Sequence, residues 1–269
     1  MTTILVVCGL GHEARIAAGS NIVTVAGGGV RAILERRLQA VPREGIDAVI
    51  SFGLAGALDP LLRVGDILVP DHVLSLDGES WPTTPELRER WTGFGIGEPD
   101  RPASMPRSSS EAPLRGAPQD EEGGEIDPRP RPEVRVEREP RITPSGSIAL
   151  LGVDAPVLGT ADKARLRADT GAAAVDMESH IAARYAAAHD LPFAALRAVS
   201  DGADHSLPPV AGAAMRPDGS VDVLGVIRGL ARDPGQLAAL LATARDAGRA
   251  FRALRRVRGF LGPGFGLQL

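Results

Sequence analysis

The chain has 269 residues, of which 43% are hydrophobic but only 3% aromatic, so its core must consist mainly of Ala, Val, Leu and Ile. A formal net charge of −4 argues against a general nucleic-acid binder. One cysteine excludes an internal disulfide, and neither a secretory signal nor an apolar run of roughly 20 residues is present, which predicts a cytoplasmic protein.

Strands and helices alternate in the first part of the chain. β-Branched runs predict strands at residues 4–8, 22–26 and 47–52, each followed by glycine, and a further strand over 66–76. Apolar residues at helical spacing predict a helix over 30–40. This alternation favours an α/β fold.

The composition changes at residues 93–147. Ten of the 22 prolines fall between Pro99 and Pro144, among Ser, Gly, Glu and Arg residues. Such a proline density is incompatible with a helix or a sheet, and few apolar side chains are available for a core. We predict a low-complexity, disordered insertion within one domain of residues 1–269, because neither flank holds a complete core of its own.

Regular patterning returns after the insertion. Strands are predicted at 148–153, 172–176 and 192–200, and helices at 161–168, 177–189, 221–230 and 236–258. Together with the first part of the chain, these elements predict an α/β single domain whose central mixed β-sheet is flanked by helices.

One early motif matches a dinucleotide-binding fingerprint. Residues 9–14 (GLGHEA) follow a strand and fit the pattern G-x-G-x-x-A. However, only the 12 residues 9–20 separate the two strands, which leaves little room for a crossover helix. The second strand also ends in Ala26 and three glycines instead of the acidic residue that holds a ribose hydroxyl. We therefore expect no nicotinamide cofactor.

Those three glycines, Gly27, Gly28 and Gly29, stand between a strand and a helix. If their backbone N–H groups are free, they suit an anion such as phosphate. A tight turn that needs positive φ explains them equally well.

A further run of small residues covers 51–60 (SFGLAGALDP). Gly53, Ala55 and Gly56 at a strand end would let a flat ligand approach the backbone. Taken alone, close packing of the strand against a helix is the better interpretation of this run.

A pair of carboxylates follows at the turn from a strand to a helix, where open α/β sheets bind ligands. An ionised Glu178 accepts two hydrogen bonds, which suits the neighbouring hydroxyls of a ribose, and Met177 offers an apolar surface to a sugar or base. Asp176 is more typical of an acidic helix N-terminus.

A third carboxylate ends the next strand. Asp201 follows Ser200, and Arg197 is a charge within a strand that otherwise reads as buried, so it needs a partner. As a general acid near neutral pH, Asp201 would need a pKa raised by roughly three units. An N-cap or turn aspartate is the alternative interpretation.

The remaining polar residues predict no further site. The five histidines lack metal-ligand spacing and no cysteine pair exists, so we expect no metal. The basic residues are almost all arginine, and we ascribe the single lysine, Lys163, to genome composition.

Three runs together resemble the nucleoside phosphorylase/nucleosidase superfamily, which includes purine nucleoside phosphorylases, methylthioadenosine/S-adenosylhomocysteine nucleosidases and futalosine hydrolases. The matching runs are residues 53–56 with 65–66, residues 175–178, and residues 197–201. Residues 175–180 (VDMESH), 200–209 and 234–237 most resemble the hopanoid-associated phosphorylases. That resemblance implies cleavage of the N-glycosidic bond of adenosylhopane, with adenine as the leaving base and no cofactor other than phosphate as a co-substrate.

The resemblance also implies catalytic roles. Asp201 would protonate N7 of the leaving adenine, and Glu178 would hold the ribose hydroxyls and stabilise an oxocarbenium-like transition state. Glu13 matches an early glutamate that binds the nucleophilic water in the nucleosidases.

Substrate-binding roles follow from the same resemblance. Met177 would pack on the sugar, Arg197 and Ser200 would orient Asp201, and the small residues Gly53, Ala55 and Gly56 would border the substrate.

The chain departs from the family pattern at the nucleophile. Leu54 stands where some members have a serine for the anion site, so phosphate would rely on Gly27, Gly28 and Gly29 with an arginine such as Arg15 or Arg31. Phosphorolysis and hydrolysis both remain open.

Alternative functions remain for the same motifs. One is a methylthioadenosine/S-adenosylhomocysteine or futalosine nucleosidase, and another is a non-catalytic nucleoside-binding scaffold. Relatives assemble as homo-oligomers, which we expect here. The last helix alternates arginines with apolar residues and could lie on an anionic inner membrane, although a core-packed helix with a solvated arginine face is favoured.

Overall fold

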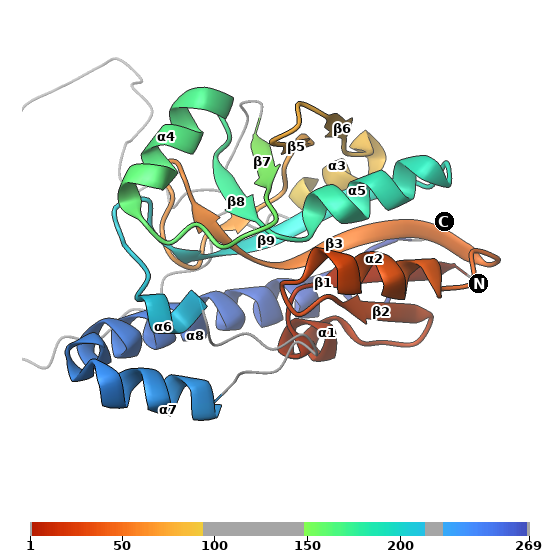
Figure 1. The fold of residues 1–269 in the computed structure, drawn as a ribbon. Helices are drawn as coiled ribbons and strands as arrows, with labels where there is room; N and C mark the ends of the chain where they lie inside the picture. Colours follow the sequence, from red (N-terminus) through yellow and green to blue (C-terminus); the bar gives the residue numbers. More distant parts are fainter. Residues whose placement is uncertain (1, 94–147, 213–222, 268–269) are drawn as a thin grey trace, which may run out of the picture. The chain divides into compact units, whose positions relative to one another are not determined.

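The computed structural model describes residues 2–93, 148–212 and 223–267, all of which belong to one unit (Figure 1). The predicted insertion at 93–147 falls almost entirely outside the described residues.

The regular elements follow the expected alternation. The strands are β1 (Thr3–Cys8), β2 (Ile22–Ala26), β3 (Ile46–Ala57), β4 (Ile67–Leu68), β5 (His72–Ser75), β6 (Ser80–Pro82), β7 (Ala149–Gly152), β8 (Ala174–Asp176) and β9 (Phe193–Asp201). The helices are α1 (Gly11–Ala17), α2 (Arg31–Gln39), α3 (Pro85–Gly93), α4 (Thr160–Thr170), α5 (Ser179–Ala188), α6 (Pro209–Gly212), α7 (Val223–Arg232) and α8 (Leu237–Leu261), with a 3₁₀ turn at Pro234–Gln236.

A mixed sheet carries the fold, in the order β2-β1-β3-β8-β7-β5-β6, with β9 paired to β3 and β4. Strand β3 runs parallel to β1 on one side and to β9 on the other. Its last residues, Gly56 and Ala57, pair antiparallel with β8. The carboxyl ends of β1, β3, β8 and β9 therefore meet at one place. The predicted fold class, an α/β domain with a central mixed sheet, is confirmed.

Both faces of the sheet are buried, which explains the continuous apolar runs in the sequence. In β1, Ile4 and Val6 pack with residues of α8, whereas Leu5 and Val7 pack with residues of α2 and α5. Helices α2 and α5 thus cover one face and α1 and α8 the other (Figure 1).

The expected strand over 66–76 is divided into β4 and β5, because Pro70 lies between them and cannot donate a ladder hydrogen bond. Strand β4 pairs with β9, whereas β5 pairs with β6 and β7. The short helix α1 occupies the connection between β1 and β2, for which the 12 residues 9–20 left little room.

Helix α8 uses its apolar side in the core. Leu254 and Val257 are buried, whereas Phe260 is exposed. Two of the apolar residues that would have faced a membrane, Leu254 and Val257, are therefore packed in the core, which favours the interpretation as a core-packed helix. Within the described ranges, no helix is both long and apolar enough to span a membrane.

Candidate active site

A cavity of about 200 Å³ opens where the carboxyl ends of β1, β3, β8 and β9 meet. Its apolar lining consists of Leu10, Leu54, Val153, Pro156, Val157, Val175, Met177 and Leu207. Its polar side chains are Glu13, Asp176, Glu178 and Ser200, and Gly9, Ala55 and Gly56 complete it. A largely apolar pocket with a few convergent carboxylates is typical of a small-molecule site.

Glu13 projects from the first turn of α1 and is buried. Its Oε2 accepts hydrogen bonds from the backbone N–H groups of Gly9 and Leu10, both at 2.8 Å, and its Oε1 accepts one from Leu54 at 2.8 Å. Burial raises the pKa of Glu13, while Arg197 and these three hydrogen bonds act in the opposite direction. Leu54 therefore contributes its backbone N–H to the site, although it lacks the serine hydroxyl of some relatives.

The small residues of β3 make room for side chains of the protein itself. A Cβ at Gly53 would lie 2.6 Å from both Glu13 Oε1 and Arg197 Nη1, and one at Gly56 would lie 3.0 Å from Asp201 Oδ2. Ala55 and Gly56 line the cavity, but Gly53 does not. Gly53 was expected to border the substrate; in the structure it packs closely against the side chains of Glu13 and Arg197 instead.

Glu178 follows β8 as the N-cap residue of α5 and is 7% exposed. Its side chain lies close to β1, since a Cβ at Gly9 would be 2.6 Å from Glu178 Oε1. Burial raises the pKa of Glu178 to about 8; Arg197 opposes this shift, whereas Asp176 and Glu13 add to it. This shift favours the protonated form of the Glu178 carboxyl group in the free protein.

Replacing Glu178 by Gln should stabilise the protein in alkaline solution. Because the folded state binds the Glu178 proton more tightly than the unfolded state, the stability that this proton provides is present at low pH. This stability is lost as the pH rises from 4.5, the ordinary pKa of a glutamate, through about 8, the raised pKa in the folded state. We expect Glu178→Gln to raise the free energy of unfolding by about 1 kcal/mol at pH 9 and by much less at pH 5, measured by urea unfolding. An equal effect at both pH values would contradict the assigned cause.

Arg197 on β9 is completely buried, and its guanidinium group forms ion pairs and hydrogen bonds, as a charge within an apolar strand requires. Its Nη2 lies 2.5 Å from Asp176 Oδ2 and donates to Ser51 Oγ, while its Nη1 is 3.8 Å from Glu178 Oε2. We expected Arg197 to orient Asp201; the structure pairs it with Asp176 instead. Asp176 is accordingly the countercharge of Arg197 and also accepts from the Ser179 N–H at the start of α5.

Asp201 ends β9 beside the lining residues Gly56 and Ser200. Ser200 Oγ donates to Asp201 Oδ1 at 2.6 Å, as the resemblance implied. The other carboxylate oxygen of Asp201, Oδ2, lies 2.5 Å from Nζ of Lys163 on α4. The sequence analysis had ascribed this single lysine to genome composition. Its rarity in an arginine-rich chain was the signal that could have identified it.

The glycine turn after β2 differs from the expected anion site. The N–H of Gly27 donates to Cys8 O and that of Gly28 to Gly9 O, so neither is free for a phosphate. Gly28 and Gly29 have φ of 65° and 70°. The turn interpretation is therefore correct, because the chain must reverse beside β1 in a conformation that only glycine adopts readily.

Neither of the two arginines that were expected to bind phosphate, Arg15 and Arg31, lines the cavity. Arg31 Nε pairs with Glu35 and its Nη1 pairs with Asp154. Arg15 lines a separate groove between α1 and α8 and is not among the residues that line the cavity.

Sequence and structure comparisons relate this site to known proteins. The model of one protein family, described as the phosphorylase superfamily, matches residues 3–216. The chain belongs to the phosphorylase superfamily. This membership confirms the predicted class of enzyme, purine nucleoside phosphorylases and nucleosidases, and the resemblance on which that prediction relied, at the level of the superfamily. A search of curated proteins found no match.

Solved structures share the fold of this superfamily member at low sequence identity. A 5′-methylthioadenosine/S-adenosylhomocysteine nucleosidase from Helicobacter pylori has a TM-score of 0.54 at 12% identity, over 96% of this chain and 97% of its own. The Streptococcus pneumoniae enzyme of that name has a TM-score of 0.54 at 14% identity, over 97% of this chain and 100% of its own. The futalosine hydrolase of Helicobacter pylori has a TM-score of 0.52 at 12% identity, over 94% of this chain and 97% of its own.

Proposed function

We propose that the protein cleaves the N-glycosidic bond of a 5′-modified purine nucleoside and releases adenine. One observation carries this proposal: in a member of the phosphorylase superfamily, Glu13 and Glu178 line a largely apolar cavity, and Asp201 lies against its lining residues Gly56 and Ser200. No cofactor is required for this chemistry.

The reaction divides between the three carboxyl groups. As the bond between C1′ and N9 breaks, its electrons pass to the base, and Asp201 gives its proton to N7. Glu178 in its ionised form accepts hydrogen bonds from the ribose hydroxyls and stabilises the positive charge that develops on the sugar, while Met177 packs against the ring. These roles follow the superfamily resemblance and are supported by the burial of both carboxylates.

We further propose water as the nucleophile. Glu13 is fixed by three backbone N–H groups and can orient a water molecule and take up its proton as the oxygen attacks C1′. Phosphate finds less support, because the N–H groups of Gly27 and Gly28 are engaged and Arg31 is paired with carboxylates.

The substituent on C5′ is proposed to be apolar. Val153, Pro156, Val157 and Leu207 provide a wall without charge beside the sugar site. This wall suits the hydrocarbon of adenosylhopane, the proposed substrate, and equally the methylthio group of methylthioadenosine; S-adenosylhomocysteine and futalosine are further alternatives. A homo-oligomer remains part of the proposal.

Product analysis tests the proposal. The full chain is incubated with each of these nucleosides, with and without phosphate, and the base and sugar products are separated by chromatography. We expect adenine and a free ribosyl product at a rate that does not depend on phosphate. Base release that requires phosphate would overturn hydrolysis. Tight adenine binding without turnover of any substrate would favour the non-catalytic scaffold.

The pH dependence should follow the buried carboxyl groups. Because Glu178 must be ionised to accept from the ribose and its pKa is raised to about 8, we expect kcat/KM to fall by about tenfold for each pH unit below 8. In Glu178→Gln this acidic limb should disappear or move to lower pH, at a reduced rate. An unchanged limb in the variant would assign it to another group.

A further inference from the structure

Lys163 is an unusual residue in this chain. It is the only lysine in the sequence, and its side chain is 0% exposed. Its Nζ lies 2.5 Å from Asp201 Oδ2, 2.8 Å from Gly202 O and 2.8 Å from His205 O. An ammonium group has three N–H donors, and each of them has an acceptor here.

These contacts leave the Asp201 carboxyl group with one orientation. Lys163 holds Oδ2, the Ser200 hydroxyl holds Oδ1, and Gly56 leaves the space that a Cβ would take beside Oδ2. Lys163 also ties the turn from Gly202 to His205 to the same nitrogen. The ion pair therefore joins α4 to the end of β9 at the edge of the cavity.

Stability alone is a poor reason for such a pair. Removing two charges from water costs several kcal/mol for each ion, and well-packed apolar residues commonly serve stability as well or better. A buried pair is understandable where a carboxylate must be held and its charge must be stabilised at a particular step.

We propose that Lys163 is the positioning residue for Asp201, an inference that rests on the proposed function. Lys163 does not touch the base; it holds the acid in line with the leaving base. In this step Asp201 carries on Oδ1 a proton taken up from solvent; once that proton passes to N7, the carboxylate that remains is stabilised by the adjacent ammonium, which keeps its own three protons.

The test compares two leaving groups. Adenine needs a proton to leave, whereas 4-nitrophenolate from 4-nitrophenyl riboside does not. We expect Lys163→Met to lower kcat for the adenine nucleoside by about 10²-fold, with a much smaller change in its KM and little change in 4-nitrophenyl riboside cleavage. The exposed Arg165→Met on the same helix is the matched control and should affect neither substrate.

If Lys163→Met lowers kcat equally for both substrates, the role of Lys163 is merely structural. If it lowers kcat for neither substrate, Lys163 has no role in the reaction. The variant Asp201→Asn distinguishes a failure of the proposed function from a failure of the proposed role of Lys163. If it retains adenine release, the proposed function fails; if only the Lys163 variant is active, this inference alone fails. Should Lys163→Met not fold, Lys163→Ala with added propylamine should regain adenine release, whereas propanol of similar size should not. No gain with the amine would overturn the inference.

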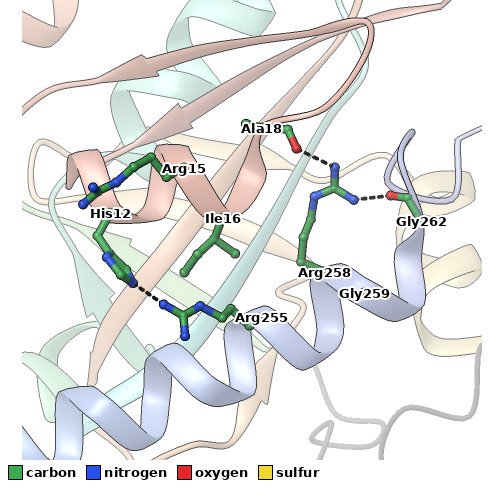
Figure 2. Close-up of a pocket in the computed structure, with 8 residues that line it drawn as sticks. All are labelled: His12, Arg15, Ile16, Ala18, Arg255, Arg258, Gly259 and Gly262. Carbon is green, nitrogen blue, oxygen red and sulfur yellow. Dashed lines mark hydrogen bonds between the residues drawn. The ribbon is translucent and has the colours of Figure 1, made fainter.

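A second inference concerns the groove between α1 and α8, which Figure 2 shows. This groove of about 740 Å³ is lined by His12, Arg15, Ile16, Ala18, Arg255, Arg258, Gly259 and Gly262. None of these described lining residues is acidic. Helix α1 borders both sites, because its residue Glu13 lines the candidate active site whereas His12, Arg15 and Ile16 line the groove.

The cationic side chains of the groove differ in their partners. Arg258 donates to the carbonyl groups of Ala17 and Ala18 and lies over the ring of Phe265, which makes it part of the core. Arg255 Nη2 lies 3.0 Å from His12 Nε2, a neutral acceptor (Figure 2). Burial lowers the pKa of His12, and Arg255 and Arg15 lower it further, so the histidine is uncharged at neutral pH.

The geometry points to a binding site for a phosphate group in this groove, held by Arg15 and Arg255 with His12 beside it. Arginine forks match phosphate oxygens, and an anion would balance the positive charge that gathers between the two helices. The cavity is larger than an inorganic ion, which leaves room for a phosphate ester, whether free or the headgroup of a lipid.

Titration with pyrophosphate, followed by calorimetry and by the NMR signal of the His12 ring, tests this site. We expect saturable binding that protonates His12, and Arg15→Ala and Arg255→Ala should each weaken it by about tenfold or more. Arg249→Ala is the control on α8, because Arg249 pairs with Asp246 and does not line the groove. Flotation with phosphatidylglycerol vesicles distinguishes a lipid headgroup from a soluble ester. If Arg249→Ala weakens binding as much as Arg15→Ala and Arg255→Ala do, or if sodium chloride of the same ionic strength protonates His12 to the same extent, the inference is overturned.

Discussion

Replacing Asp201 by Asn should lower kcat for adenine release by about 10²- to 10⁴-fold, the usual contribution of a positioned general acid. Asparagine has nearly the same shape: its one carbonyl oxygen can accept from Lys163, and its amide N–H can donate to the Ser200 hydroxyl, whereas Asp201 accepts from both groups. It cannot supply the proton that N7 needs, so binding of the nucleoside should be changed far less than its cleavage.

Single-turnover measurement of adenine release with saturating nucleoside checks this result, because it separates chemistry from product release. Asp204→Asn is the matched control: Asp204 is exposed and lies three residues along the chain. A variant at Asp201 with full activity would refute both the acid assignment and the proposed reaction. A loss of the same size at Asp204 would indicate damage to the turn after β9.

Replacing Arg197 by Met should lower the free energy of unfolding by about 3–5 kcal/mol, because it leaves buried carboxylates without their countercharge. Asp176 is 2.5 Å from the guanidinium, and Glu13 and Glu178 are both influenced by its charge. Once the arginine is lost, Asp176 is left as a buried carboxylate without its countercharge, and the ionised forms of Glu13 and Glu178 lose the charge that favours them.

Urea unfolding at pH 7 measures this loss, with Arg165→Met as the control. Arg165 and Asp162 also form an ion pair, but their side chains are 70% and 59% exposed, and such surface pairs contribute at most about 1 kcal/mol. The double variant Arg197→Met with Asp176→Asn should recover part of the stability, since it removes both charges. If the double variant is no more stable than the single one, the loss stems from packing and not from charge.

The sheet and its helices were accessible from local patterns. β1, β2, β3 and β9 are short apolar runs with turn residues at their ends, and burial of both sheet faces produces that pattern directly. The division of the strand over 66–76 was also readable in principle, since Pro70 stands inside it. Its partners were not readable, because pairing with β9 or β7 joins segments far apart in the chain.

The site was accessible only in part. Glu13, Glu178 and Asp201 were proposed from motifs that occur in order in a recognisable superfamily; the structure places Glu13 and Glu178 in the lining of the cavity and Asp201 next to its lining residues Gly56 and Ser200. Lys163 was missed, because the residue that needs it lies 38 positions away. The anion role of Gly27 and Gly28 was wrong, because their N–H groups bond to the end of β1, a contact that no local pattern reveals.

The sequence by itself determined the α/β fold class, most of the strands of the sheet and the superfamily to which the chain belongs, and it proposed the carboxylates of the site. Apolar periodicity, turn residues and motif order are properties of short segments, and short segments are what a sequence displays. Only the tertiary structure decided the partners of those charges: Asp176 with Arg197, Asp201 with Lys163, and Glu13 with three backbone N–H groups. A buried charge depends on the groups within a few ångströms of it, and the fold brings those groups together from distant parts of the chain.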